Sequence, residues 1–276
     1  MGVLEGKVAL ITGAARGQGR AHALRLAEEG ADVVAVDICR QIPGVAIPMA
    51  TPDDLEETAD LVRGLGRRVV TGVVDVRDQA ALADVVAAGV RELGRLDIAL
   101  ANAGVWPIQL EEPTDPAARI DVWEASIGVN LTGVWNTLEV AVPHLRAGGR
   151  GGSIVITSSS SAIKTIADGS VAMAAYTAAK VGVLGLLRVA ASDLAADWIR
   201  VNAVLPGAID TPMSNNGVTE VYYEKYAEFL SKIGNALPVR RMEPTEISNA
   251  ILFLVADTGR HITGVSLPVE AGVALT

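Results

Sequence analysis

A short apolar run that leads directly into a glycine-rich turn is the feature that most constrains how this chain can fold. Residues 7–12 read K-V-A-L-I-T, which is typical of a buried strand. The turn that follows opens a segment whose apolar positions fit a helix. Glycines between a strand and a helix allow a tight turn and let the backbone approach a pyrophosphate at the helix N-terminus. This context favours dinucleotide binding over an ordinary turn, at Gly13, Arg16, Gly17, Gln18 and Gly19.

An acidic residue, Asp37, ends the next apolar run, A-D-V-V-A-V-D over residues 31–37. A carboxylate about 20 residues beyond the glycine loop accepts hydrogen bonds from the adenosine ribose and repels a 2′-phosphate. Arg16 acts in the opposite direction, because a cation at the loop attracts a 2′-phosphate. Since Asp37 would lie at the ribose itself, the sequence favours NAD over NADP. The alternative is an acidic strand end that faces water.

Residues 39–50 (C-R-Q-I-P-G-V-A-I-P-M-A) form an irregular apolar insert. Its prolines and glycine exclude a regular helix or a central strand. Ile42, Val45, Ile47 and Met49 are too apolar for a freely solvated loop, so we expect them to pack on another part of the molecule. Because the insert follows the acid at the second strand, it is placed to cover the adenosine end of the cofactor. A surface patch or a subunit contact is the alternative.

Further along the chain, apolar runs alternate with helix-like segments. Strands are predicted at 68–74, 97–101, 152–157, 199–205 and 262–269, and helices at 51–66, 78–93, 121–145, 176–196 and 243–256. This alternation predicts a parallel sheet with helices on both faces. We therefore expect an α/β fold of the Rossmann type, in which a single doubly wound domain over residues 1–276 holds a sheet of about seven strands.

Composition argues against several classes of function. The net charge is −9 and no basic cluster occurs, so nucleic acid is not an expected partner. Cys39 is the single cysteine and the histidines His22, His144 and His261 are scattered, so neither a disulfide nor a metal site is expected. The start M-G-V-L-E-G-K lacks the pattern of a signal peptide, and no long uncharged apolar stretch predicts a membrane span. We expect a soluble, cytoplasmic protein.

Tyr176 and Lys180 stand four residues apart at the end of the stretch S-S-S-S-A-I-K-T-I-A-D-G-S-V-A-M-A-A-Y-T-A-A-K, residues 158–180. If this part is helical, positions i and i+4 share a face, so the phenol and the ammonium project into one space. An adjacent cation favours a phenolate, which makes Tyr176 a candidate acid or base near neutral pH. A serine hydroxyl from the start of the stretch is a candidate partner for a substrate oxygen. The same spacing also occurs on solvated helices.

Residues near predicted strand ends and one helical amide are further candidates. Asp75 follows the third strand and is a candidate partner for an adenine amino group. Asn102-Ala103-Gly104 ends the fourth strand with small residues, which admit a flat cofactor, brace the central sheet, or do both. Asn130 lies inside a predicted helix, where a buried amide must find partners. A contact with water or lysine and simple packing are both open for it.

Two segments are candidates for substrate contact. Trp106 to Gln109 form an apolar turn at the carboxyl end of the fourth strand, where they are placed to form a pocket wall. Residues 212–237 are mixed in character and contain three tyrosines. We interpret this second segment as a lid over the pocket, with a surface helical hairpin as the alternative.

Together these features resemble the short-chain dehydrogenases/reductases over almost the whole chain. The resemblance rests on T-G-x-x-x-G-x-G from Thr12, Asp75, N-A-G at 102–104, Asn130, the serine run, Tyr176-x-x-x-Lys180 and Pro206-Gly207. The opening T-G-A-A-R-G-Q-G-R and the segments V-D-I-C and M-A-T-P-D-D-L-E-E-T are similar to the carveol-dehydrogenase-like, mycofactocin-associated branch.

The resemblance implies a role for each matching residue. Tyr176 would be the catalytic acid/base, Lys180 would lower its pKa and bind the nicotinamide ribose, and Asn130 would hold a water in a proton relay. A homotetramer is also implied, with the long apolar helices around Asn130 and Lys180 as dimer faces. NAD would contact Gly13, Arg16, Gly17, Gln18, Gly19, Asp37, Asp75, Val76, Asn102, Ala103, Gly104, Tyr176, Lys180, Pro206, Gly207, Ile209 and Thr211.

The catalytic serine of the family is usually the second of a pair that ends the fifth strand. Matching G-S-I-V-I-T-S-S to that pattern gives the role to Ser159, which lies seventeen residues before Tyr176. This separation is longer than is usual in the family, so we assign the extra residues to the loop that follows Ser159. Ser158 and Ser160 remain alternatives.

The sequence supports one leading hypothesis for the function and two alternatives. The first is an NAD-dependent oxidoreductase for a hydrophobic secondary alcohol or ketone, terpenoid- or steroid-like, because Trp106, Ile108, Met213 and Tyr222 are apolar candidates for the pocket. The second keeps this chemistry but retains NAD through turnover, with a redox partner such as mycofactocin as the electron acceptor and the insert as the retaining cover. The third is a non-catalytic nucleotide-binding regulator, which would need no catalytic serine, tyrosine or lysine.

Overall fold

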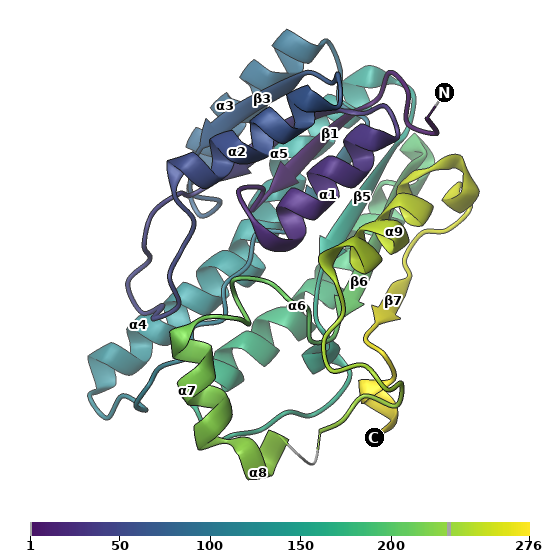
Figure 1. Ribbon diagram of the computed structural model, residues 1–276. Coiled ribbons are helices and arrows are strands. Elements are labelled where there is room, and N and C mark those ends of the chain that lie inside the picture. Colours follow the sequence, from purple (N-terminus) through teal and green to yellow (C-terminus); the bar gives the residue numbers. More distant parts are fainter. Residues whose placement is uncertain (1, 231–232) are drawn as a thin grey trace.

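The computed structural model describes residues 2–230 and 233–276, and within them seven strands form one sheet (Figure 1). Each neighbouring pair is parallel, in the order β3-β2-β1-β4-β5-β6-β7. The strands are β1 (Val8–Thr12), β2 (Asp32–Asp37), β3 (Val69–Val73), β4 (Ile98–Ala101), β5 (Gly152–Thr157), β6 (Ile199–Pro206) and β7 (Ser266–Val269). The predicted α/β fold of the Rossmann type is confirmed.

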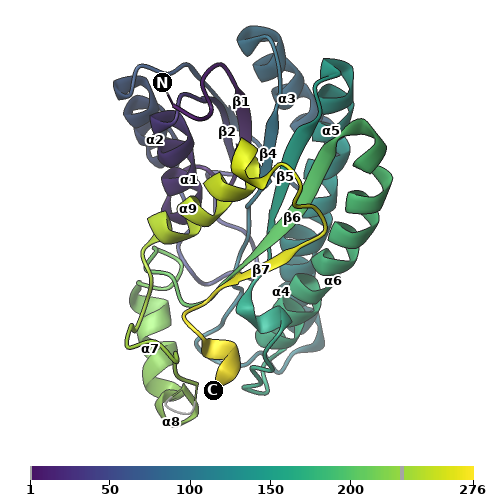
Figure 2. The same ribbon diagram turned by 90° about the vertical axis from the view of Figure 1, so that its right-hand side faces the viewer.

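Helices cover both faces of the sheet. Figure 2 shows α1 (Gly17–Glu28), α2 (Pro52–Gly64) and α9 (Pro244–Val255) on one side, with α3 (Gln79–Leu93), α5 (Gly133–Gly148) and α6 (Val171–Asp193) on the other. Leu10 packs in the apolar cluster that contains α3, α5 and α6, whereas its neighbour Ile11 packs in the cluster that contains α1, α2 and α9. Because both faces are covered at the centre of the sheet, β1 and β4 are buried at every position, whereas the edge strand β7 alternates between exposed and half-buried residues.

The chain winds outward from β1 to β3, returns to the centre, and then winds the other way from β4 to β7. The carboxyl ends of β1 and β4 therefore leave a crevice where the winding reverses, which is the place where open α/β sheets bind ligands. Helix α6 is the one described helix that is long and apolar enough to cross a membrane, but half of that apolar window is buried inside the fold.

Local sequence signals account for several helix starts. Thr51 caps α2 by accepting from the amide of Asp54, and the Asp54 carboxylate accepts from the Thr51 amide in return. Asp78 caps α3 in a similar way, with its carboxylate accepting from the amide of Ala81. Both starts agree with the predicted helices.

The helix predicted over 121–145 differs from the one observed. It begins earlier, as α4 (Pro116–Ile127), because Asp115 caps it and Pro116 suits the first turn. It then passes through a π-helical turn, η1 (Gly128–Thr132), before continuing as α5. Inserted π turns of this kind are frequent at functional sites. This one contains Asn130.

Two other observed element boundaries also differ from the predicted ones. The last strand begins at Ser266 rather than at residue 262, because the preceding residues turn at Gly264, although main-chain hydrogen bonds of Gly264 and Val265 still join them to β6. Asn202 donates to the carbonyl oxygen of Ile262, and Gly264 adopts a φ of +76°. At the other boundary, α6 starts at Val171, five residues before Tyr176, so that Tyr176 lies inside the helix rather than at its beginning.

Beyond the carboxyl ends of the strands lies a smaller group of elements (Figure 1). It contains α4, α7 (Gly217–Lys225), α8 (Ala227–Leu230) and the insert at 39–50. A third apolar cluster joins the insert to α4 and α7. The predicted lid at 212–237 thus holds two short helices, and its residues 231–232 lie outside the described part of the chain. Single 3-10 turns complete the described structure: η2 (Ser160–Ala162), η3 (Ala195–Asp197), η4 (Asp257–Gly259) and η5 (Val273–Leu275).

Candidate active site

One cavity of about 500 Å³ at the carboxyl ends of the strands contains the site residues predicted from the sequence. The predicted catalytic side chains Asn130, Ser159, Tyr176 and Lys180 all line it. The predicted cofactor contacts also line it, namely Gly13, Arg16, Gly17, Gln18, Gly19, Asp37, Asp75, Val76, Asn102, Ala103, Gly104, Pro206, Gly207, Ile209 and Thr211. Residues far apart in the chain therefore meet in one space.

The glycine loop has the close approaches that its sequence implies. Gly13 and Gly17 have φ values of +70° and +55°, which residues other than glycine rarely adopt. A Cβ on Gly19 would lie 1.9 Å from the carbonyl oxygen of Gly13, so the first turn of α1 lies against the loop. A Cβ on Gly13 would lie 2.8 Å from the Cα of Ala103. Only glycine fits this packing, and it exposes backbone to the cavity.

Asp37 ends β2 with its carboxylate held by the main chain. One oxygen accepts from the amide of Ala15 at 3.1 Å and the other accepts from the amide of Cys39 at 3.2 Å. Burial raises the pKa of Asp37, while these amides and the nearby Arg16 oppose the rise. The carboxylate thus has a fixed orientation at the edge of the glycine loop, as expected of a ribose-binding acid.

The insert is held in place by polar groups as well as by its apolar side chains. Gln41 donates to the carbonyl oxygens of Val45 and Ile47, at 2.5 and 3.2 Å. Arg16 donates from the glycine loop to the carbonyl oxygen of Pro48. Arg16 therefore links the glycine loop to the insert.

The apolar side chains of the insert pack against α4 and α7, a location that the sequence did not predict. Ile42, Val45 and Ile47 are buried in the cluster that also contains Val122 of α4 and Tyr222 of α7. The backbone is equally close, because a Cβ on Gly44 would lie 2.9 Å from the carbonyl oxygen of Asp121, and Gln109 donates to the carbonyl oxygen of Gly44 at 2.7 Å. The insert therefore connects the glycine-loop side of the cavity to α4 and α7.

Asp75 forms a bidentate salt bridge with Arg77. Arg77 donates from Nε and Nη2 to its carboxylate, with the shortest contact at 2.7 Å. Burial acts to raise the pKa of Asp75, but the hydrogen bonds from Arg77 outweigh burial and the pKa is lowered. The carboxylate is therefore ionised and can accept a further donor at the cavity.

Asn102-Ala103-Gly104 braces the central strands and also lines the cavity. The amides of Asn102 and Ala103 donate to the hydroxyl of Thr12, and the Asn102 side chain donates to the Thr12 carbonyl oxygen at 3.0 Å. Thr157, at the end of β5, donates to Asn102 Oδ1 at 3.3 Å. Bracing of the sheet, one of the two roles considered from sequence, is thus observed directly.

Lys180 and Tyr176 lie on the same side of α6, with Lys180 Nζ 5.6 Å from the centre of the tyrosine ring. Lys180 donates to the carbonyl oxygen of Thr157 at 2.8 Å, so its ammonium is directed at the end of β5. Burial lowers the pKa of Lys180 to about 8.

The electrostatics of Tyr176 differ from the sequence expectation. Burial raises the pKa of the Tyr176 phenol, and the neighbouring Ser159 hydroxyl acts in the opposite direction. A lysine that lowers this pKa was expected, but the Lys180 ammonium is hydrogen-bonded to Thr157 and is not a cause of the shift. Near neutral pH Tyr176 is therefore a neutral phenol, which is able to donate a proton.

The serine run separates into distinct roles. Ser158 donates to the carbonyl oxygen of Lys180 at 2.8 Å, which links β5 to α6. Ser159 begins the turn η2, where its hydroxyl accepts from the amide of Ser161 at 3.2 Å, and it is the serine that influences the Tyr176 pKa. Ser160 also lines the cavity. Of the three candidates, Ser159 is the one whose hydroxyl acts on the tyrosine.

Asn130 uses its side chain to hold the segment after β4. Its Oδ1 accepts from the amide of Val105 at 3.0 Å, and its Nδ2 donates to the Val105 carbonyl oxygen at 2.9 Å and to Ser126 Oγ at 3.2 Å. A Cβ on Gly104 would lie 3.0 Å from Asn130 Oδ1 and 3.5 Å from Lys180 Nζ. Asn130 therefore lies beside Lys180, but its amide is bonded to the protein main chain.

The expected substrate wall is mostly present. Trp106, Met213 and Tyr222 line the cavity, and the Trp106 and Tyr222 rings meet edge to face with centres 5.1 Å apart. Ile108 was expected in this wall but does not line the cavity, because it is buried behind it in the third apolar cluster.

Some contacts at the cavity were not expected from the sequence. Met173 and Val273 line it from α6 and from the end of the chain. Asp168 lies next to it and accepts a hydrogen bond from Tyr222 at 2.7 Å. A signal for Asp168 was present, because Asp168-Gly169-Ser170 immediately before an apolar helix is a typical helix start.

Comparisons with known proteins agree with this geometry. The family model described as enoyl-(acyl carrier protein) reductase matches residues 13–274. A putative short-chain type dehydrogenase/reductase of Mycolicibacterium smegmatis is 48% identical over 99% of each chain, and (-)-trans-carveol dehydrogenase of Rhodococcus erythropolis is 45% identical over 100% of each. The crystal structure of carveol dehydrogenase from Mycobacterium avium in complex with NAD superposes with a TM-score of 0.91, at 47% identity over 100% of both chains. The protein therefore belongs to the short-chain dehydrogenase/reductase family.

Proposed function

We propose that this protein is an NAD-dependent oxidoreductase that interconverts a hydrophobic secondary alcohol and its ketone. The observation that carries the proposal is the meeting of Ser159, Tyr176 and Lys180 with the glycine loop in a single cavity. A proton-transfer group, a hydroxyl partner for the substrate oxygen and a dinucleotide cradle are the three parts that this chemistry needs.

The residues of the cavity fit NAD. Gly13, Gly17 and Gly19 leave the backbone open at the N-terminus of α1, which is a favourable position for a pyrophosphate. The Asp37 carboxylate is suited to ribose hydroxyls and opposes a 2′-phosphate, and Asp75 is suited to the adenine amino group. Relatives support this choice, since the Mycobacterium avium structure contains NAD and a Mycobacterium tuberculosis relative, 43% identical, is named an NAD-dependent oxidoreductase.

In alcohol oxidation, Tyr176 Oη accepts the proton of the substrate hydroxyl, and in ketone reduction it returns that proton. Ser159 Oγ donates a hydrogen bond to the substrate oxygen, which stabilises the charge that develops there. Lys180 has donors beyond the one given to Thr157, and these bind the nicotinamide ribose. Bound NAD supplies the hydride acceptor.

The substrate class follows from the apolar wall of the same cavity. Aromatic and apolar side chains form that wall, namely Trp106, Met213 and Tyr222 together with Ile42, Val45 and Ile47 of the insert. Burial of apolar rings against such a surface contributes about 25 cal/mol per Å². A cyclic terpenoid- or steroid-like alcohol suits the site, in agreement with the 45% identity to (-)-trans-carveol dehydrogenase.

A variant of this function keeps NAD bound through turnover and passes electrons to a redox partner such as mycofactocin. The contacts of the insert favour this alternative, because Arg16 and Gln109 each donate a hydrogen bond to the insert and hold the insert at the cavity. A regulator without catalysis is disfavoured, since binding alone does not call for Tyr176 and Lys180 in one buried space.

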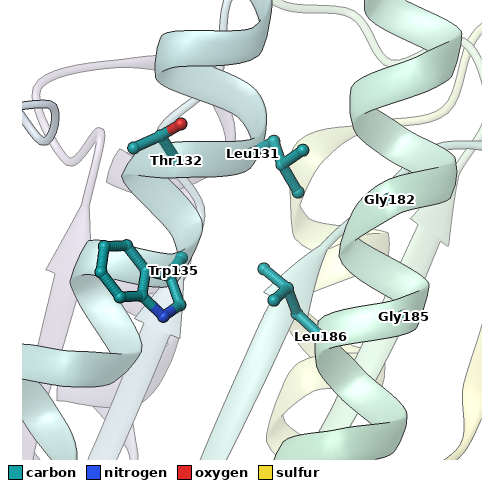
Figure 3. A pocket seen from close by; sticks show the side chains of 6 residues that line it. All are labelled: Leu131, Thr132, Trp135, Gly182, Gly185 and Leu186. Atoms are coloured by element: carbon teal, nitrogen blue, oxygen red, sulfur yellow. The ribbon is translucent and has the colours of Figure 1, made fainter.

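We also propose that the protein forms homotetramers, in which α5 and α6 form the face between the two copies of each dimer. Figure 3 shows the groove between these helices, which has a volume of about 470 Å³ and is lined by Leu131, Thr132, Trp135, Gly182, Gly185 and Leu186. Trp135 is 44% exposed and Val189 of α6 is 62% exposed. Such an apolar face on two long helices is suited to a second copy of the chain. Light scattering of the wild type and of Trp135→Glu would test it, and a wild-type monomer would contradict it.

Turnover of a panel of cyclic terpenoid, steroid and short aliphatic secondary alcohols tests the main proposal. Each alcohol is assayed with added NAD and, separately, with an artificial electron acceptor and no added NAD. Turnover of cyclic apolar alcohols with added NAD supports ordinary exchange. Turnover with the acceptor alone, together with stoichiometric nucleotide in the purified protein, supports retention. Tight NAD binding with no turnover in either assay would contradict the enzyme and favour the non-catalytic nucleotide-binding regulator.

A further inference from the structure

Asp168 connects two elements that border the substrate side of the cavity. Its Oδ1 accepts from the amide and from the hydroxyl of Ser170, at 2.9 and 2.7 Å. Its Oδ2 accepts from the hydroxyl of Tyr222 at 2.7 Å. One carboxylate thus binds the residue that starts α6 and a residue on α7.

Ser170 is the N-terminal cap of α6. Its hydroxyl accepts from the amide of Met173 at 3.1 Å while donating to Asp168. This arrangement orients the hydroxyl for capping, because its proton is directed away from the helix. Tyr176 lies about one and a half turns further along α6. The position of the proposed proton-transfer residue therefore depends on a start that Asp168 holds.

Tyr222 makes the other half of the contact. It is 5% exposed, and its ring packs against Trp106 and against Tyr226, whose centre is 4.7 Å away. Burial, followed by the contact with Asp168, raises the pKa of the Tyr222 phenol, so the phenol keeps its proton and donates it. A hydrogen bond to a charged acceptor in a buried setting is stronger than one between neutral groups.

The loop that supplies Asp168 is the segment between Ser159 and the start of α6. The contact to Tyr222 thus joins two segments that are 54 residues apart in sequence. Opening of α7 away from the cavity must break this bond.

We infer that Asp168 and Tyr222 form a latch that couples the position of α7 over the substrate to the position of α6 and its Tyr176. The inference rests on the proposed function, in which Tyr176 transfers the substrate proton. Asp168 and Tyr222 are positioning residues, because they act through α6 and α7 rather than on the reacting atoms. When the latch is closed, the substrate wall and the start of α6 are fixed together.

Tyr222→Phe is the sharpest test, since it removes one hydroxyl and keeps the ring packing. Tyr226→Phe is the matched control, because Tyr226 packs against Tyr222 without bonding to Asp168 and does not line the cavity. Tyr222→Phe should raise the KM for the alcohol about tenfold while kcat changes much less, which is the effect of losing one hydrogen bond to a charged group. NAD affinity should not change. Tyr226→Phe should keep the wild-type KM.

Amide hydrogen exchange of the NAD-bound protein separates the latch from the proposed function, because it needs no substrate. Exchange should become faster in residues 163–170 and 217–225 of Tyr222→Phe, and it should stay unchanged in β1 and β4. Asp168→Ala should speed exchange in the same segments and by more, because it also removes the acceptor of Ser170, and the double variant should exceed Asp168→Ala by little, because the bond to Tyr222 is already lost. Faster exchange in these segments supports the latch even if the protein oxidises no alcohol. In that case the proposed function would be wrong and the latch would still stand. Unchanged exchange and KM in Tyr222→Phe, or effects that multiply in the double variant, would overturn it.

Discussion

Lys180 Nζ donates to the carbonyl oxygen of Thr157 at 2.8 Å, across the boundary between α6 and the end of β5. Ser158 joins the same two elements in the other direction, through its 2.8 Å bond to the carbonyl oxygen of Lys180. The lysine is 3% exposed, and burial lowers the pKa of its ammonium to about 8. The sheet therefore holds a buried cation of reduced basicity at the floor of the cavity, on the same helix face as Tyr176.

Lys180→Met removes this cation and keeps most of the side-chain volume. We expect kcat for alcohol oxidation to fall by about 100-fold or more and NAD to bind more weakly, because the nicotinamide ribose loses the donor that holds it beside Tyr176. Thermal unfolding should shift little, since loss of the bond to Thr157 is offset by removal of a buried charge. Lys7→Met, at the amino end of β1 and far from the cavity, is the control. Wild-type kcat in Lys180→Met would contradict the role of the lysine.

Asp37→Asn keeps the shape of the side chain and removes its charge. We expect the ratio of kcat/KM with NADP to that with NAD to rise about tenfold, because a 2′-phosphate no longer meets a like charge and Arg16 remains nearby. Asp53→Asn, which removes an exposed charge from the first turn of α2, should leave the ratio unchanged. Steady-state kinetics with both cofactors measures the effect. An unaltered ratio in Asp37→Asn would show that the carboxylate does not select the cofactor.

Gly19→Ala tests the packing of the glycine loop. Its Cβ would lie 1.9 Å from the carbonyl oxygen of Gly13, so the loop must move. We expect the free energy of unfolding to fall by about 2 kcal/mol and NAD binding to be lost or strongly weakened. At Gly64, the end of α2, a Cβ would meet nothing within 4 Å, so Gly64→Ala should be neutral or slightly stabilising. Equal behaviour of the two variants would contradict the close approach.

His22 should make the protein sensitive to acid. It is buried in α1, with Nδ1 2.8 Å from Ser248 Oγ, and burial lowers its pKa from 6.5 to about 3. The unfolded chain takes up a proton on this residue below pH 6.5 while the folded chain does not, so stability is lost as the pH falls toward 3. The difference approaches about 5 kcal/mol at the acid end. His22→Gln should unfold at a temperature that depends less on pH over this range, and an identical dependence would show that His22 is not responsible.

Much of the fold could be predicted because its signals are local. The apolar runs of β1, β2 and β5 and the caps at Thr51 and Asp78 depend on residues next to one another in the chain. The glycine loop and the Tyr176–Lys180 pair are similarly local. Their joint presence in one chain indicated the cavity in which the structure brings them together.

The features that could not be predicted depend on contacts between distant residues. The π turn at Asn130 accompanies hydrogen bonds to Val105, which no spacing in the sequence reveals. The insert was expected to pack somewhere, but its burial against α4 and α7 depends on where those helices lie. The pKa of Tyr176 depends on burial and on the direction of the Lys180 side chain, and both are properties of the folded chain.

Turnover by Tyr176→Phe as a function of pH tests the central claim most directly. In the wild type, alcohol oxidation should become faster from neutral to alkaline pH, because burial raises the pKa of a phenol that must lose its proton to act as the base. Tyr176→Phe should keep its fold and its NAD binding, lose about 1000-fold in kcat and lose this rise with pH. A Tyr176→Phe protein that oxidises the same alcohol at the wild-type rate, with the wild-type pH profile, would contradict the account.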